Sequence, residues 1–339
     1  MILTNELFWN ALKDSGSVDE SRGMQLIELN AGNSKLITFS KNHSYGEYIF
    51  DWGWADAYER SGIPYYPKLT SMVPFTPATA PHFWGNTNDW PELLRKHDEL
   101  LPRHSSAHFL FTTKEEQMFL TENNYIPRLS FQYHFFNENY SSFDDFLGKL
   151  KNKKAKNIRE ERRFPNFEIE RLTGSELKES HAEEMYNFYL MTLSEKKGIP
   201  YLTKDFFHQL IRDLPNNILY VRAGNIAGAF FYYDDKTLYG RYWGSRDFIP
   251  NLHFELCYYQ GIEFAIEKKI SVFEAGAQGE HKIARGFRPI ITTSAHKINH
   301  PLFAQAIADF IKNESQEVLR IIEELSKLLP FLKENSRHE

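Results

Sequence analysis

The chain has 339 residues, an apolar content of 42% and a formal net charge of −5 at pH 7. This composition supports a folded core, and the length allows two domains of about 150 residues each. The negative balance argues against a protein whose main partner is nucleic acid, although a local basic patch stays open. A single cysteine, Cys257, excludes an intrachain disulfide and a cysteine-rich zinc site.

The N-terminal segment does not have the pattern of a secretory signal. It lacks a basic start, and Thr4, Glu6 and Asn10 interrupt its apolar run. No stretch reaches the roughly 18 apolar residues that a membrane-spanning helix needs. The histidines show no His-Glu-x-x-His spacing. We therefore expect a soluble, cytoplasmic protein with no membrane span and no metal site.

The first elements in chain order are an amphipathic helix over 5–14 and two strands over 24–30 and 34–40. Residues 43–60 then gather aromatic and acidic side chains, among them Asp51 and Trp54. These residues predict either a partly buried helix with a polar edge or a cleft wall that binds a sugar or a peptide.

Residues 64–81 carry prolines at 64, 67, 74, 77 and 81. Proline cannot donate to a sheet ladder, so the pattern predicts an edge strand or a loop held in extended form. After it, the sequence predicts helices over 89–101 and 115–122 and strands over 106–112 and 131–136, which close a first domain near residue 145.

Residues 149–163 (KLKNKKAKNIREERR) form a basic helical run. One interpretation is a solvated helix between domains, and the other is a phosphate-binding surface for a nucleotide, a tRNA or a nucleotide-linked sugar.

The second half of the chain predicts a further α/β arrangement. Helices are expected over 176–192, 204–212 and 253–269, and strands over 167–172, 219–223, 226–234 and 237–245. Arg241 and Tyr242 lie near the end of the last of these strands. From Pro301 to about Leu332 the apolar spacing predicts a long helix, interrupted where Glu314 takes an expected apolar position. This helix could pack on the first domain or pair with a second copy of the protein, so a monomer and a homodimer both stay open.

The candidate site is the polar loop that follows the short strand at 272–273. Small residues between Ala275 and Gly279 allow the backbone to approach a ligand closely. Lysine and arginine can hold an anionic carrier, and carboxylates or histidine can take a proton from an amine. The candidate bases are Glu274, Glu280 and His281, and the candidate carrier-binding residues are Gln278, Lys282 and Arg285.

Several of these segments resemble the FemAB-like acyltransferases of the GNAT fold, a group labelled peptidoglycan biosynthesis or recognition proteins. The segments are FEAGAQGEHKIARGF at 273–287, HSYGEYIFDWGWADAYER at 43–60, YYPKLTSMVPFTPATAP at 65–81 and HFELCYYQGIEFAIE at 253–267. The resemblance implies a substrate groove at the proline-bearing segment, with Tyr66, Lys68 and Thr76 as contact residues. It also implies carrier contacts from the basic run, for which we select Lys156 and Arg159. We expect substrate or carrier contacts from Asp51, Trp54, Arg241 and Tyr242 as well.

The resemblance implies an α/β fold of tandem GNAT-like lobes, each a mixed sheet flanked by helices. The expected domains are a first lobe over 1–148, a basic connector over 149–164, a second lobe over 165–300 and a C-terminal helix over 301–339. The implied function is transfer of an acyl or aminoacyl group to an amine, with a peptidoglycan precursor or a peptide as a candidate acceptor. The alternative is a non-catalytic protein that binds a cell-wall precursor.

The acyl donor would be an acyl-CoA or an aminoacyl-tRNA, which would make tRNA a partner. One departure from the GNAT pattern bears on the choice. The segment before the helix at 253 reads Asp247 to Leu252 and contains no glycine. A loop without glycine is a poor cradle for a pyrophosphate, so the sequence favours an aminoacyl-tRNA or another activated donor over acetyl-CoA.

Overall fold

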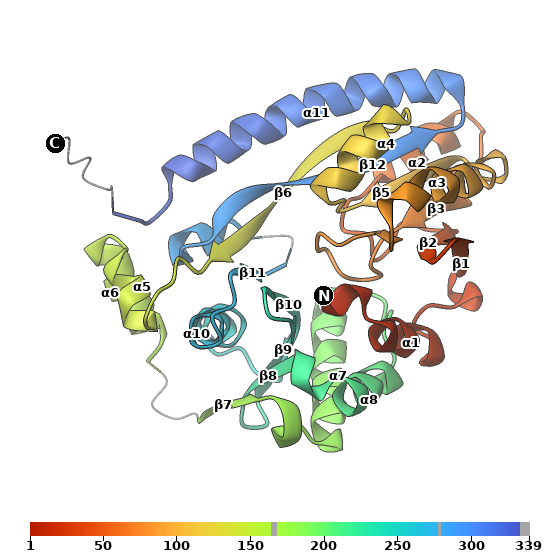
Figure 1. Ribbon diagram of the computed structural model, residues 1–339. Helices are drawn as coiled ribbons and strands as arrows, with labels where there is room; N and C mark the ends of the chain where they lie inside the picture. The colour runs from red at the N-terminus through yellow and green to blue at the C-terminus, as the bar shows by residue number, and fades with distance from the viewer. Residues whose placement is uncertain (164–167, 277–278, 333–339) are drawn as a thin grey trace. The chain divides into compact units, whose positions relative to one another are not determined.

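The computed structural model describes residues 1–163, 168–276 and 279–332 (Figure 1). Its residues form two compact units. Unit 1 takes Met1–Ile2, Gln132–Ile290 and Ile322–Glu339, and unit 2 takes Leu3–Phe131 and Ile291–Ile321. Strands β6 (Ile126–Phe136) and β12 (Arg288–Ile298) each contribute residues to both units.

Unit 2 is built on a mixed sheet. β1 (Met24–Ala31) and β2 (Ser34–Lys41) form an antiparallel hairpin, and β2 also pairs with β4 (Phe83–Trp84). β3 (Lys68–Ser71) pairs antiparallel with β2 and parallel with β5 (Ser106–Leu110), which in turn pairs antiparallel with β12. The helices are α1 (Glu6–Asp14), α2 (Trp52–Arg60), α3 (Trp90–Asp98), α4 (Lys114–Glu122) and the first part of α11 (Pro301–Lys327).

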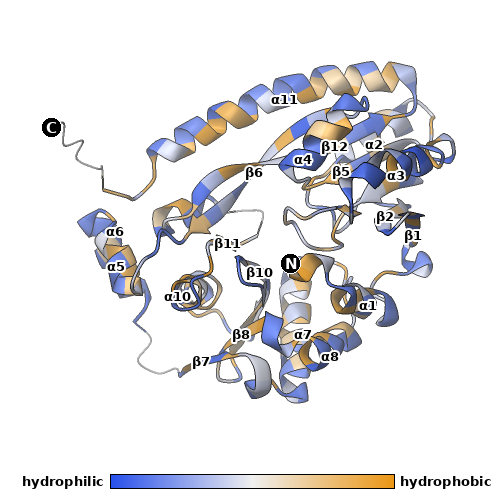
Figure 2. Ribbon diagram, viewed as in Figure 1, coloured by the Kyte–Doolittle hydropathy of each residue, from blue (hydrophilic) through white to orange (hydrophobic). Residues whose placement is uncertain are grey.

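Two clusters of buried side chains hold unit 2 together. One gathers around Phe109, Leu93 and Leu120, between the sheet and helices α3 and α4. The other joins Tyr58 and Tyr65 to Ile307 and Ile311 of α11. Apolar and polar residues alternate along α11 in Figure 2, as expected for a helix that buries one stripe.

Unit 1 contains a second run of paired strands. Four strands pair antiparallel, each with the next one along the chain: β7 (Ile169–Leu172), β8 (Ile218–Ala223), β9 (Ala227–Tyr233) and β10 (Thr237–Ser245). β11 (Val272–Glu274) then pairs parallel with β10 and antiparallel with the end of β6. The helices are α5 (Phe143–Gly148), α6 (Asn152–Glu161), α7 (Glu179–Glu195), α8 (Lys204–Asp213), α9 (Leu252–Phe254) and α10 (Gln260–Glu267). Between α9 and α10 the chain makes one π-helical turn, η7 (Glu255–Tyr259), and after β11 a 3₁₀ segment, η8 (Glu280–Arg285).

The structure corrects several expected elements. Residues 43–51 are a loop rather than the start of a helix, because Gly46 and Tyr48 adopt positive φ angles of 78° and 63°. The proline-rich segment is neither an edge nor only a loop, since the proline-free residues Lys68–Ser71 form the interior strand β3. Helix α5 lies where the sequence predicted none, and the long C-terminal helix ends at Lys327.

The expected α/β class, with mixed sheets flanked by helices and a long C-terminal helix, is confirmed. The expected domain boundaries at residues 148, 164 and 300 stay predictions. No helix among the described residues combines the length and apolar character needed to cross a membrane.

Glu314, which interrupts the apolar stripe of α11, has a partner inside unit 2. The Arg128 guanidinium donates to both of its carboxylate oxygens, with Nε–Oε2 at 2.7 Å and Nη2–Oε1 at 2.8 Å. Arg128 is 8% exposed, donates to the Phe50 carbonyl and lies 4.9 Å from the centre of the Trp54 ring. The polar residue in the stripe therefore neutralises a buried cation.

We expect Glu314→Leu to destabilise the protein although it restores the apolar pattern. The substitution leaves the buried donors of the Arg128 guanidinium without their carboxylate, which should cost about 2 kcal/mol in free energy of unfolding. Urea denaturation checks this value. The matched control is Gln316→Leu, an exposed position on the same helix, which should change stability by less than about 0.5 kcal/mol. A Glu314→Leu variant as stable as this control would contradict the assignment.

Candidate active site

Strands β10 and β11 diverge at the centre of unit 1. They are in register only from Thr237↔Val272 to Tyr239↔Glu274. β11 ends at Glu274, whereas β10 continues to Ser245. The edge of β10 beyond Tyr239 therefore has no β11 residue opposite it.

β10 carries a β-bulge at the same point. Its register with β9 passes from Gly240↔Phe231 to Tyr242↔Phe230, so no residue of β9 opposes Arg241. Bulges re-aim side chains and recur beside active sites. Here the predicted site residue Arg241 is the extra residue of the bulge, and Tyr242 is the first residue after the register shift.

A cavity of about 100 Å³ lies against this divergent end. That volume corresponds to a few water molecules, or to a small acyl group. Its wall comes from β9, β10, the helical segment after Asn251 and the residue after Glu274. The lining residues are Ala229, Phe230, Phe231, Gly240, Arg241, Tyr242, Trp243, His253, Cys257, Tyr258 and Ala275.

The π-helical turn supplies Cys257 and Tyr258 to this wall. Such turns insert an extra residue into a helix and are frequent at functional sites. Burial raises the pKa of the Cys257 thiol far above its ordinary value, so the sulfur is a protonated wall atom rather than a nucleophile.

Glu274 ends β11 directly before the cavity. Glu274 is 8% exposed, and none of the described residues forms a hydrogen bond with its buried Oε2 atom. The His134 Nε2 lies 3.9 Å from this oxygen, across the antiparallel pairing of β11 with β6. Burial raises the pKa of Glu274 to about 8, against the opposing charge of Arg241. A carboxyl group that titrates near neutral pH is suited to act as a general base or acid.

Lys282, on η8, is 2% exposed. Its Nζ donates to the Gly276 carbonyl at 3.0 Å and lies 5.8 Å from the ring centres of both Tyr133 and Tyr258. Burial lowers the pKa of Lys282 to about 7. Burial, and then the charge of Lys282, lowers the pKa of His134 to about 4. Glu274, His134 and Lys282 are thus buried titratable groups within one small region.

The other predicted residues of this loop have different surroundings. Arg285 is 5% exposed, stacks 3.5 Å above the Phe254 ring and donates to Glu161 at 2.8 Å and to the His281 carbonyl. His281 is exposed, and its Nε2 lies 3.0 Å from the Tyr258 hydroxyl. Glu280 is exposed to solvent. Gln278 lies outside the described residues.

The basic run divides into an outer and an inner part. The Lys156 and Arg159 side chains are 76% and 53% exposed, with Glu160 and Asp144 as surface partners. Arg162, from the same run, instead donates to Glu255 and Glu263 within unit 1. The two residues selected from the sequence are therefore among the exposed cations of the run.

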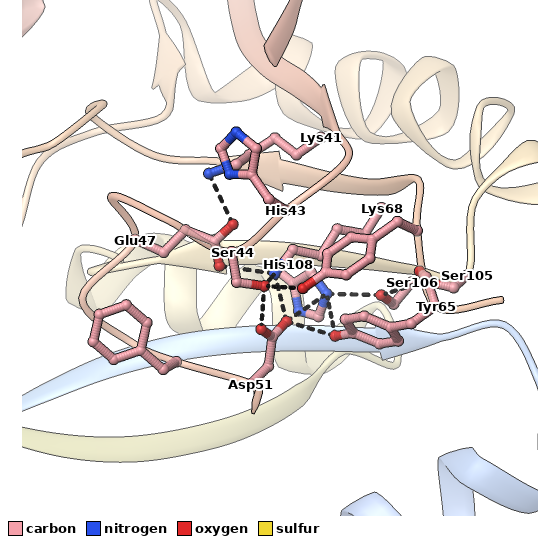
Figure 3. A network of polar contacts seen from close by, with 12 residues as sticks. Lys41, His43, Ser44, Glu47, Asp51, Tyr65, Lys68, Ser105, Ser106 and His108 are labelled. Carbon is pink, nitrogen blue, oxygen red and sulfur yellow. Dashed lines mark hydrogen bonds and ion pairs between the residues drawn. The ribbon is translucent and has the colours of Figure 1, made fainter. Parts of the chain in front are cut away.

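Two of the predicted residues of the first half of the chain, Asp51 and Lys68, belong to a buried polar network in unit 2 (Figure 3). Lys68 has no exposed surface and donates to Ser44, Glu47 and Asp51. Asp51 also accepts from Tyr65 and Ser44, and Lys41 pairs with Glu47 at 2.9 Å. These contacts make the ammonium and carboxylate groups internal partners of one another.

The charges of this network fix one another's protonation. Burial would raise the pKa of Asp51, but Lys68 and His108 hold it far below its ordinary value. Burial would lower the pKa of Lys68, but Glu47 and Asp51 raise it. Both groups thus stay ionised, since each desolvated charge has an opposite charge beside it.

The remaining predicted residues have other surroundings. Tyr66 is half-buried, and its hydroxyl lies 3.0 Å from the Ser44 hydroxyl. Trp54 is 6% exposed and packs edge-on against His296. Thr76 is buried, and its hydroxyl donates to the Pro74 carbonyl. The roles of Tyr66, Lys68, Thr76, Asp51 and Trp54 in substrate contact stay predictions.

Sequence reasoning missed His134, His253, Trp243 and Tyr258 as site residues. His134 lies in a predicted strand, and nothing in that strand indicates that it faces Glu274. His253 and Tyr258 lie in a predicted helix whose periodicity assigned Tyr258 to an apolar stripe. Trp243, two residues past Arg241, could have been found from the end of its strand. Among the described residues, no cluster of histidine, cysteine or carboxylate side chains is arranged for a metal ion.

Three solved structures resemble this chain at low sequence identity. A domain of a provisionally named lysylphosphatidylglycerol synthetase from Agrobacterium fabrum has a TM-score of 0.53 at 11% identity, covering 90% of this chain and 95% of its own. L-PGS from Bacillus licheniformis has a TM-score of 0.50 at 11% identity, covering 96% and 97%. FemX has a TM-score of 0.50 at 10% identity, covering 89% and 93%. No curated protein sequence matches the chain.

The divergent strands and the bulge therefore occur in a chain with the α/β fold of FemX and of the lysylphosphatidylglycerol synthetase structures. The family model for FemAB-like proteins, described as peptidoglycan biosynthesis/recognition, matches residues 2–333. The chain belongs to the FemAB-like family, and the resemblance seen in its sequence is confirmed.

The buried histidine of the unit 2 network should make stability depend on pH. Burial lowers the pKa of His108 to about 3, whereas the unfolded chain titrates near 6.5. Below pH 6.5 the unfolded state binds a proton that the folded state does not, so stability falls as the pH decreases from 6.5 toward 3. We expect His108 to lower the free energy of unfolding by about 2 kcal/mol at pH 5 relative to pH 7.

The measurement is the free energy of unfolding of wild type and His108→Gln from pH 7 to pH 5. The difference between them should shrink by that amount, because glutamine binds no proton. Parallel curves for the two proteins would show that His108 is not the neutral, buried group described.

Proposed function

We propose that the protein is an N-acyltransferase that moves an aminoacyl or acyl group from an activated carrier to an amine. The acceptor we propose is a peptidoglycan precursor. One observation carries the proposal: Glu274, with a pKa raised to about 8, ends β11 where that strand parts from β10 beside a cavity. Family membership supports the peptidoglycan context.

The chemistry requires a neutral amine. An ammonium group has no lone pair, so a base must hold its proton before nitrogen attacks the carbonyl carbon. The Glu274 carboxylate is this base in our proposal, with the His134 imidazole 3.9 Å away on the neighbouring strand. The new C–N bond forms, the bond from carbon to the carrier's oxygen or sulfur breaks, and the leaving group takes up a proton.

Lys282 has a separate role in the proposal. In its protonated form, an ammonium in this buried region stabilises negative charge that develops on the carbonyl oxygen. Its Nζ is positioned by the Gly276 carbonyl, and its pKa of about 7 makes the charged form increasingly populated below neutral pH. The rate should therefore depend on pH through both Glu274, which must be ionised, and Lys282, which must be charged.

An aminoacyl-tRNA is the donor that we propose over an acyl-CoA. The segment from Asp247 to Leu252 contains no glycine, which argues against a pyrophosphate cradle at the start of the following helix. The exposed Lys156 and Arg159 offer positive charge to a polyanionic carrier.

A second candidate is a binding protein without catalysis. The specific observation in its favour is that Arg285, a predicted carrier contact, donates to Glu161 and to a backbone carbonyl. If all cations of the loop served only the fold, the protein would bind a cell-wall precursor without turning it over.

The first test replaces the proposed base. Glu274→Gln should lower kcat by about 10²- to 10⁴-fold, the usual contribution of general base catalysis, in a transfer assay that follows the mass of a peptidoglycan precursor. The thermal melt should not fall, because glutamine avoids a buried charge. Glu280→Gln, six residues on and exposed, is the control and should leave kcat unchanged.

A loss of transfer in Glu280→Gln, with activity kept in Glu274→Gln, would reassign the base. Precursor binding by the wild type, with no turnover of any aminoacyl-tRNA or acyl-CoA, would favour the binding protein instead.

The second test concerns the carrier. The double variant Lys156→Ala/Arg159→Ala removes two exposed cations that a phosphate backbone could neutralise. We expect KM for aminoacyl-tRNA to rise by at least about fivefold, with kcat unchanged and with a weaker dependence on salt. Lys204→Ala/Arg212→Ala on α8 is the matched control, also exposed. Equal effects of the two pairs, or no effect of either, would remove α6 from the carrier site.

A further inference from the structure

A second cavity lies in unit 2, lined by residues of helix α1 and of strands β1, β2 and β4. Its volume is about 260 Å³, slightly below the usual range of roughly 300–1,000 Å³ for drug-sized ligands. The lining residues are Glu6, Trp9, Asn10, Lys13, Leu26, Glu28, Lys35, Ile37 and Trp84. None of them belongs to the proposed transfer site in unit 1.

Two polar stripes meet at this cavity. Glu6, Asn10 and Lys13 follow one another at i, i+4 and i+7, so they share a face of α1. Glu28 on β1 and Lys35 on β2 supply charge from the sheet. A helix that packs on a sheet ordinarily meets it with apolar side chains. The core face of α1 does so with Phe8 and Leu12, and the polar stripe beside that face is not needed for packing.

The charges of the cavity are balanced and only partly paired. Lys35 Nζ lies 3.1 Å from Glu6, whose side chain is 78% exposed, so this ion pair is a weak surface contact. Among the residues that the structure describes, Lys13 and Glu28 form no ion pair. The cavity thus offers one ammonium and one carboxylate that the protein leaves to solvent.

The cavity also has an aromatic wall. Lys35 Nζ lies 4.7 Å from the centre of the Trp84 ring, and Trp9 meets Trp84 edge-on at 5.5 Å. Trp9 is 5% exposed and donates its indole N–H to the Leu3 carbonyl. The two indole rings give apolar contact to a ligand that carries charges at its other end.

We propose that this cavity binds a small zwitterion, a molecule that carries one ammonium and one carboxylate as a free α-amino acid does. A simple anion would face Glu6 and Glu28, and a simple cation would face Lys13 and Lys35. A ligand with both charges can pair its carboxylate with Lys13 and its ammonium with Glu28, while its side chain contacts Trp84. This proposal does not depend on the proposed transferase activity.

The test is isothermal titration calorimetry of the full chain with L-alanine and L-lysine. Acetate and ethylammonium each carry only one of the two charges, and methyl glucoside carries none. We expect at least one amino acid to bind about tenfold or more tighter than either single-charge probe, because it makes one more charge-assisted hydrogen bond than they do.

Variants locate the binding. Lys13→Met and Glu28→Gln change exposed side chains, so the fold should survive, and each should weaken amino acid binding by at least about fivefold. Lys114→Met and Glu122→Gln on α4, also exposed, are the matched controls and should bind as wild type. Glu28→Lys should lose amino acid binding and gain binding of inorganic phosphate.

Three results would overturn the proposal: no amino acid binds, a single-charge probe or methyl glucoside binds as tightly as the amino acids, or the α4 controls weaken binding as much as Lys13→Met and Glu28→Gln.

Discussion

The removal of ionisable groups from water is the constraint on which unit 1 depends. Glu274 and Lys282 are both nearly inaccessible, and burial moves the pKa of one up and of the other down until both titrate near neutrality. Neither shift requires an unusual residue. It requires that β11 end at Glu274 while β10 continues, and that η8 return Lys282 to the Gly276 carbonyl. The backbone geometry thus determines the protonation chemistry.

In unit 2, by contrast, each buried charged group of the polar network lies beside a group of opposite charge. Lys68 lies against Glu47 and Asp51, and Lys41 against Glu47, so opposite charges neutralise each other and remain ionised. Arg128 and Glu314 repeat this arrangement between β6 and α11. Paired buried charges of this kind fix which segments lie together, because loss of either partner leaves the other uncompensated. One chain therefore contains a region of poorly compensated titratable groups and another of fully compensated ones.

The sequence predicted most of the regular elements, because their signals are local. The periodicity of 24–40 and 237–245 marked strands whose residues alternate between two environments. Two kinds of feature were not predicted from the sequence. β3 is interior because β2 and β5 flank it, and prolines around Lys68–Ser71 conceal such long-range pairing. The bulge at Arg241 and the π-helical turn at Cys257 each add one residue to a regular element, a change with no compositional mark.

The sequence predicted only part of the candidate site, because residue types are visible locally whereas burial depends on distant segments. Residue types in the loop after Phe273 indicated acid–base and anion chemistry, and the structure describes Glu274 and Lys282 as buried, with Glu280 and His281 on the surface. The sequence could not distinguish the two buried residues from the two surface residues, because burial depends on β6 and on the helical segment around Tyr258. Nor could it show that Arg285 and Lys68 have internal carboxylate partners, from residues far away in the sequence.

Cys257 gives the cavity of unit 1 a chemical handle. It is the chain's one cysteine, so a thiol-directed reagent can label only this position. Because burial keeps its sulfur protonated, alkylation at neutral pH should proceed slowly. A fluorophore attached there would sense the occupancy of the cavity without any engineered residue.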